Sequence, residues 1–168
     1  AFQSVPPPRA EAAPPGRGPA AVQASGAGPR SHRLILGAYL HAEPGLPEAM
    51  AGHGFVAVEG PGGRREAWGF SPAVMERLDA RRDLGRLTTG VPGRVHADDR
   101  AFTKPGVRTR SVPISAAQAE AARAKVSEYR SGHPQFSLAR TQCTTFVADV
   151  AGAAGVPVGG STSPAAPA

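Results

Sequence analysis

The sequence predicts a small α+β domain in which an antiparallel sheet packs against a few helices. One observation is a hairpin pattern, because two apolar runs at 54–59 and 64–70 flank the turn sequence Gly60-Pro61-Gly62-Gly63. The other is a pair of helix signals farther along the chain, near residues 115 and 142. The chain also carries 21 glycines and 18 prolines, roughly twice the usual share. A core spanning all 168 residues is therefore not expected.

The two ends have the composition of disordered segments. Residues 1–30 hold seven prolines, eight alanines and four glycines, with only three side chains suited to a core. Such a segment buries too little apolar surface to offset its chain entropy. Residues 157–168 have a similar composition. We expect a disordered leader or linker at 1–30, a folded domain at 31–156 and a disordered tail at 157–168.

The elements of the domain can be placed in order. A strand is predicted at 33–40, and the hairpin then places Trp68 and Phe70 on one face. Ser71-Pro72 is typical of a helix start, which predicts a helix to about Leu84. Residues 85–113 predict a long loop, with a short strand near 108–114.

Two helices are expected after that loop. Ser115 and Gln118 form a capping box at the start of the first helix, and Gly132-His133-Pro134 ends it. The second helix is expected to begin near Thr141 or Gln142 and to stop at 155–157.

The single cysteine excludes several classes of protein. Cys143 alone cannot form a disulfide scaffold, a zinc finger or an iron–sulfur site. No run of about 18 apolar residues is present, which argues against a transmembrane helix. We expect neither a metal nor an organic cofactor.

Cys143 falls at the start of the second helix, where a nucleophile is favoured. Free backbone N–H groups and the helix dipole stabilise a thiolate there, and the same N–H groups can hold a developing oxyanion. The alternative is that Cys143 is a small buried apolar side chain, as many lone cysteines are.

A cysteine nucleophile needs a base, and the best candidate is His53. It opens a strand between two glycines, so its direction is fixed and small neighbours leave room for a substrate. The alternative is a turn histidine without a catalytic role. The remaining histidines border the leader, lie in predicted loops or sit in a solvated turn: His32, His41, His96 and His133.

These motifs resemble the circularly permuted papain-like superfamily, which includes permuted NlpC-type peptidases and lecithin:retinol acyltransferase-like enzymes. The resemblance covers residues 35–156 and depends on the segments at 52–58, 67–70 and 142–147. The histidine strand precedes the cysteine helix, as in permuted members. Gln142 replaces the asparagine usual before the cysteine, whereas Cys143, Phe146 and Val147 are kept. The resemblance implies a permuted papain-like fold with Cys143 and His53 as the catalytic pair.

The residue that orients His53 is left open by the sequence. Family members often use a second histidine about a dozen residues along, but Arg65 stands there. A hairpin folded about Pro61-Gly62 places His53 opposite Phe70 and Glu66 near Ala57, roughly 13 Å from His53. Glu66 and Ser71 therefore remain weak candidates, together with backbone carbonyls.

Four further residues are candidates for the site. Gln142 is a candidate for oxyanion or substrate binding beside Cys143. Trp68 could line the cleft, but a core position on the hairpin is the preferred interpretation. Asp98-Asp99 could suggest a metal site, but no partners lie nearby in sequence, so a solvated loop is preferred.

The net charge of +6 favours an anionic partner. Aromatic residues are few and fall mostly at core positions, which argues against nucleic acid. The alternative interpretation of the charge is solubility alone.

We expect a cysteine acyl hydrolase that cleaves a phospholipid ester through a thioester. The alternatives are a peptidoglycan stem-peptide amidase or endopeptidase with the same pair, and a non-catalytic basic binding module. The expected setting is a monomeric bacterial effector or toxin module, cytoplasmic in the producer and then secreted or delivered into a target cell. Its partners would be an anionic membrane lipid or cell-wall peptide, with a secretion apparatus or a cognate inhibitor.

Overall fold

The computed structural model describes residues 28–40, 52–74, 77–79 and 82–158. Most of the expected terminal segments, and His41, lie outside these ranges. The elements follow in this order: β1 (His32–Leu40), β2 (Gly52–Glu59), β3 (Arg65–Pro72), α1 (Leu84–Thr89), β4 (Val91–Ala97), the 3-10 helix η3 (Asp99–Thr103), β5 (Arg108–Ile114), α2 (Ala116–Ser131), β6 (Gln135–Phe136) and α3 (Cys143–Ala153).

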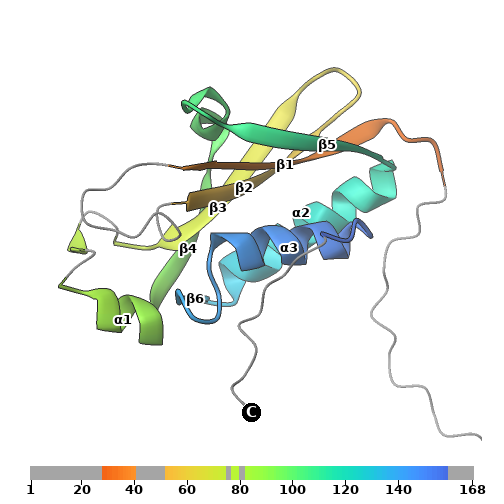
Figure 1. Ribbon diagram of the computed structural model, residues 1–168. Coiled ribbons are helices and arrows are strands. Elements are labelled where there is room, and N and C mark those ends of the chain that lie inside the picture. Colours follow the sequence, from red (N-terminus) through yellow and green to blue (C-terminus); the bar gives the residue numbers. More distant parts are fainter. Residues whose placement is uncertain (1–27, 41–51, 75–76, 80–81, 159–168) are drawn as a thin grey trace, which may run out of the picture.

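The six strands form one antiparallel sheet in the order β5-β1-β2-β3-β4-β6. Helices α2 and α3 lie together against one face of this sheet (Figure 1). The predicted α+β class, with an antiparallel sheet packed on helices, is confirmed. No described helix has both the length and the apolar character needed to cross a membrane.

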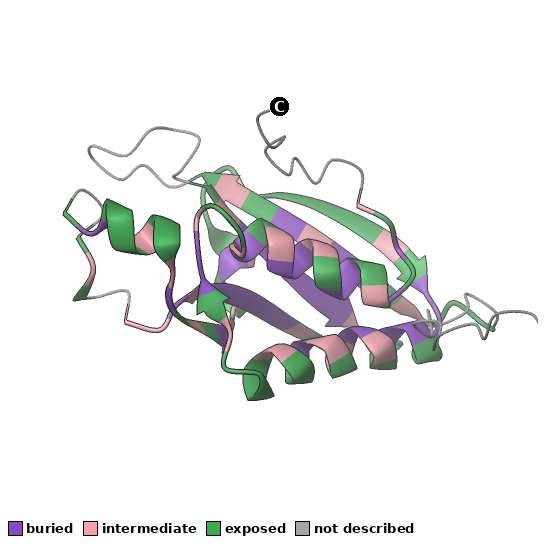
Figure 2. Ribbon diagram, turned by 90° about the horizontal axis from the view of Figure 1, so that it is seen from below, coloured by how far each residue is buried: buried purple, intermediate pink, exposed green. Residues whose placement is uncertain are grey.

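The main core lies between the sheet and the two helices. Phe70 of β3 is fully buried there against Phe136, Phe146 and Tyr129. The buried residues of α2 and α3 face the sheet (Figure 2). A smaller cluster covers the opposite face, where Phe102 of η3 packs against Phe55. Strand β2 is therefore buried in its middle, whereas Gly52 at its beginning is exposed and His53 is partly exposed.

The two predicted helices are confirmed. Helix α2 begins with the capping box of Ser115 and Gln118, whose backbone N–H groups are each accepted by the other's side chain. Helix α3 begins at Cys143 with Gln142 as its N-cap. The predicted strands of the hairpin and at 108–114 are also confirmed as β2, β3 and β5.

The helix predicted from Ser71 to Leu84 is wrong. Ser71 and Pro72 continue β3 because β4 pairs with them, Ser71 opposite Arg94 and Pro72 opposite Gly93. Within the described part of 71–83 there is no α-helix, and α1 begins only at Leu84. Local helix-start signals were outweighed by ladder hydrogen bonds to a strand that the sequence pattern did not reveal.

The long loop predicted at 85–113 is also wrong in part. It contains β4 and η3 before the expected β5. Proline and glycine at positions 92 and 93 obscured β4, and Gly93 is needed there because a Cβ atom would lie 2.4 Å from the Phe70 ring.

The hairpin register differs by one residue from the prediction. Phe55 pairs with Gly69, so Glu66 lies opposite Val58 rather than Ala57. Extending the same register places His53 opposite Ser71 rather than Phe70. The four-residue turn at 60–63 sets this register, with a left-handed φ of 78° at Gly63.

Candidate active site

His53 is the second residue of β2 and lies at the exposed beginning of that strand. Strand β1 pairs with β2 along its whole length, and Tyr39 lies directly opposite His53. Because side chains alternate along a strand, His53 shares a face with Phe55, opposite the face covered by α2 and α3. The imidazole is thus held by a rigid element while 14% of the side chain remains exposed.

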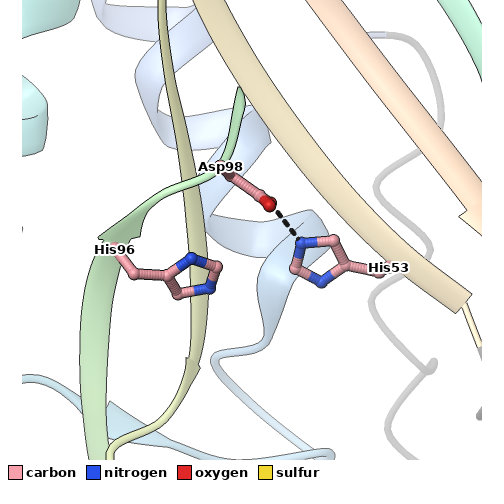
Figure 3. A group of neighbouring side chains, drawn as sticks. All are labelled: His53, His96 and Asp98. Carbon is pink, nitrogen blue, oxygen red and sulfur yellow. Dashed lines mark hydrogen bonds and ion pairs between the residues drawn. The ribbon is translucent and has the colours of Figure 1, made fainter. Parts of the chain in front are cut away.

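Asp98 makes a hydrogen bond with Nε2 of the His53 imidazole. His53 Nε2 lies 2.6 Å from Asp98 Oδ2, and only 12% of the aspartate side chain is exposed (Figure 3). Asp98 follows the last residue of β4, and its backbone N–H donates to the Ala67 carbonyl of β3. The orienting residue that sequence reasoning left open is therefore placed at Asp98 by the geometry.

The expectation of a solvated loop at Asp98 is wrong. Strand β4 pairs with β3, and β3 pairs with β2, which carries Asp98 to the sheet face of His53. A sequence signal existed in the spacing of His96 and Asp98, since residues two apart at and just beyond the end of a strand can share its face. It was missed because β4 itself was taken as loop.

Cys143 approaches from the first turn of α3. Its side chain is 8% exposed, and its Sγ lies 4.0 Å from the Gly52 carbonyl oxygen. The His53 side chain and the backbone N–H groups of Gly54 and Thr144 lie near enough to act on the pKa of the thiol. Since Nε2 of His53 faces Asp98, Nδ1 is the nitrogen that remains for the thiol. Cys143 at the start of α3, His53 on β2 and Asp98 just after β4 are called the relay below.

The electrostatics of this relay favour an ion pair. Burial alone would lower the pKa of His53, but its hydrogen bonds with Asp98 and Cys143 and their charges raise that pKa to about 9. Burial would raise the pKa of Cys143, but the His53 hydrogen bond and the N–H groups of Gly54 and Thr144 lower it below its usual value. At pH 7 both shifts favour a Cys143 thiolate beside a His53 imidazolium.

Gly69 makes room for the His53–Asp98 contact. A Cβ atom at this position would lie 2.4 Å from Asp98 Oδ2 and 3.0 Å from His53 Nε2. These distances are shorter than carbon can approach without displacing one of the two side chains. The strand therefore needs glycine here for space.

We expect Gly69→Ala to slow the alkylation of Cys143 at pH 7 by about tenfold, because separating His53 from Asp98 costs roughly one charge-assisted hydrogen bond. Iodoacetamide alkylation followed by mass spectrometry measures this rate. Gly152→Ala is the matched control, since nothing lies within 4 Å of a Cβ atom there. An unchanged rate in Gly69→Ala would contradict the proposed geometry.

Of the other residues that the sequence suggested for the site, only Gln142 is adjacent to Cys143. Gln142 is adjacent to Cys143 as the N-cap of α3, and its backbone N–H points to Thr145 Oγ1 at 3.5 Å. Trp68 is only 6% exposed within the main core, so little of it is available to a substrate. Glu66 instead pairs with Arg123 at 3.4 Å, and Ser71 lies in the ladder with β4.

Two aromatic rings that the sequence did not single out flank His53. Tyr39 lies with its ring centroid 5.3 Å from that of His53, and burial together with the Asp98 and Cys143 charges raises its pKa. His96, expected in a loop, lies on β4 with its ring 6.0 Å from His53 and nearly parallel to it. Both belong to strands that neighbour β2 or β3.

The arrangement has the geometry of a cysteine–histidine–aspartate site: a thiol at a helix N-terminus, an imidazole on a strand and a carboxylate behind the imidazole. Comparisons with known protein families, with curated proteins and with solved structures find no match to this chain. The case for a function therefore depends on the site itself.

Proposed function

We propose that this protein is a cysteine acyl hydrolase of permuted papain-like fold. The observation that carries the proposal is the relay from Cys143 through His53 to Asp98, with the pKa shifts of an ion pair. The chain order, with the histidine strand β2 before the cysteine helix α3, is consistent with the permuted arrangement.

The chemistry follows from the positions of the three groups. The Cys143 thiolate attacks the acyl carbon, and the backbone N–H groups at the start of α3 stabilise the oxyanion, with Gln142 beside them. The His53 imidazolium gives its proton to the leaving oxygen or nitrogen as the thioester forms. Neutral His53 then takes a proton from water, which attacks the thioester and releases the acid and the thiolate. Asp98 acts as a positioning residue that fixes the ring throughout.

We favour a phospholipid ester as the substrate because the surroundings of the site are positively charged. Lys104 Nζ lies 6.0 Å from the centroid of the Tyr39 ring, which itself contacts His53. Arg94 lies on β4, two residues before His96, and its side chain is exposed. Cations at such positions attract anionic headgroups. We further propose that the protein acts as an exported bacterial effector, with a cognate inhibitor as a partner.

The test is to incubate the full chain with phosphatidylglycerol vesicles, with phosphatidylcholine vesicles and with purified peptidoglycan. Mass spectrometry should detect fatty acid and lysolipid, with faster release from the anionic vesicles, and no release by Cys143→Ala. Release of stem-peptide fragments alone would replace the lipid substrate by the cell-wall one. Absence of all products, with no acyl adduct on Cys143, would overturn the hydrolase and favour a basic binding module.

A further inference from the structure

His96 forms a cluster with two residues of the relay. It lies two positions before Asp98, so both side chains share one face at the end of β4. One donor atom from each of His53, His96 and Asp98 lies within 4.8 Å of the other two (Figure 3). The hydrolysis proposed above uses His53 and Asp98 but gives His96 no part.

We propose that His53, His96 and Asp98 form a binding site for Zn²⁺. Two imidazoles and one carboxylate make a ligand set that zinc accepts, with water in a fourth position. Ligand atoms around tetrahedral zinc lie about 3.3 Å apart, because each bond is about 2.0–2.2 Å long. His53 Nε2 and Asp98 Oδ2 are 2.6 Å apart, and they would have to move slightly farther apart to bind the ion. The widest separation between two donor atoms is at most 4.8 Å. It would therefore shorten by at most about 1.5 Å, through rotation of the side chains.

The surroundings of the cluster fit a metal ligand at His96. Its Nδ1 lies 3.2 Å from the Ala97 carbonyl oxygen. A proton donated there fixes the tautomer and leaves the Nε2 lone pair for a metal, which is the usual arrangement of histidine ligands. This hydrogen bond also holds the ring in orientation.

Gly69 supplies the space in which the three side chains meet. A Cβ atom there would lie within 3.0 Å of all three residues, at Asp98 Oδ2, His96 Cε1 and His53 Nε2. The donors thus converge over a strand position that has no side chain. Such convergence, rather than one acidic group or one histidine, is what zinc binding requires.

Zinc at this site would switch the hydrolase off. The ion takes the place of the proton that His53 Nε2 shares with Asp98. The metal-bound imidazole keeps its remaining proton on Nδ1, so the ring has no free lone pair to take a proton from the water that attacks the thioester. The zinc site itself does not depend on hydrolysis.

Zinc binding is tested on full-length Cys143→Ser, so that the thiol cannot bind the metal. After EDTA treatment and desalting, ZnCl₂ is titrated in by calorimetry. We expect one zinc per chain, and His96→Asn should weaken binding by about tenfold or more. His133→Asn is the matched control, because His133 is exposed in the turn after α2 and asparagine tolerates its φ of 48°. No binding, or equal binding in His96→Asn, would overturn the site.

The regulatory consequence is tested by measuring hydrolysis with the thiol intact. Zinc should slow hydrolysis by the natural sequence, and about tenfold more zinc should be needed for the same fractional inhibition of His96→Asn. Loss of hydrolysis on EDTA treatment would contradict an inhibitory metal. An inert Cys143 would overturn the hydrolase while leaving the calorimetric result to decide the zinc site.

Discussion

Replacing His53 with alanine will slow the alkylation of Cys143 by iodoacetamide about 100-fold at pH 7. The reason is that the thiolate, not the thiol, reacts, and a cysteine with a pKa near 9 is only about 1% ionised at that pH. Burial raises the pKa of Cys143, and the interaction with His53 is the largest of the effects that lower it.

The pH dependence of alkylation shows in which direction His53 shifts the pKa of Cys143. In the natural sequence the rate should rise with a midpoint below 9, because the pKa of Cys143 is lowered. His53 should remain protonated until its own pKa of about 9, so the ion pair should persist over the neutral range. In His53→Ala the burial of Cys143 remains, and the midpoint should move to 9 or above.

The measurement is the alkylation rate from pH 5 to 10 in EDTA, with His133→Asn as the control for loss of an exposed histidine. Circular dichroism checks that His53→Ala is folded. Slow alkylation of the folded natural sequence at every pH, with no change in His53→Ala, would contradict the catalytic pair. Cys143 would then be a buried core residue.

Asp98→Ala is expected to reduce hydrolysis by about 100-fold. Removing the carboxylate takes away the acceptor for His53 Nε2, so the ring loses both its orientation and the partner that stabilises its charge. Asp98→Asn should be milder, by about tenfold, because its amide oxygen can still accept the hydrogen bond without the charge.

The neighbouring Asp99 offers a matched control, because it is exposed and opens η3. Asp99→Ala should retain the natural rate. A role in positioning also predicts that the pKa of His53 falls below about 9 in Asp98→Ala, which NMR titration of the imidazole measures. If Asp98→Ala and Asp99→Ala behave alike, Asp98 has no part in the relay.

Local patterns in the sequence were enough to predict the features that depend on neighbouring residues. The hairpin followed from its glycine-rich turn, and α2 followed from the capping box of Ser115 and Gln118. The position of Cys143 at a helix start followed from the same kind of local signal. The joint choice of Cys143 and His53 also drew on the resemblance to permuted papain-like enzymes, and their catalytic role stays a prediction.

The residue that contacts His53 Nε2 could not be predicted from local patterns, because long-range strand pairing brings it there. Asp98 is 45 positions away in sequence and reaches His53 because β4 pairs with β3. The same pairing draws Ser71 and Pro72 into a strand, although their local signals favour a helix. Long-range ladder hydrogen bonds and burial outweigh local propensity, since each local preference amounts to about 1 kcal/mol or less. The cluster of His53, His96 and Asp98 is a product of this pairing.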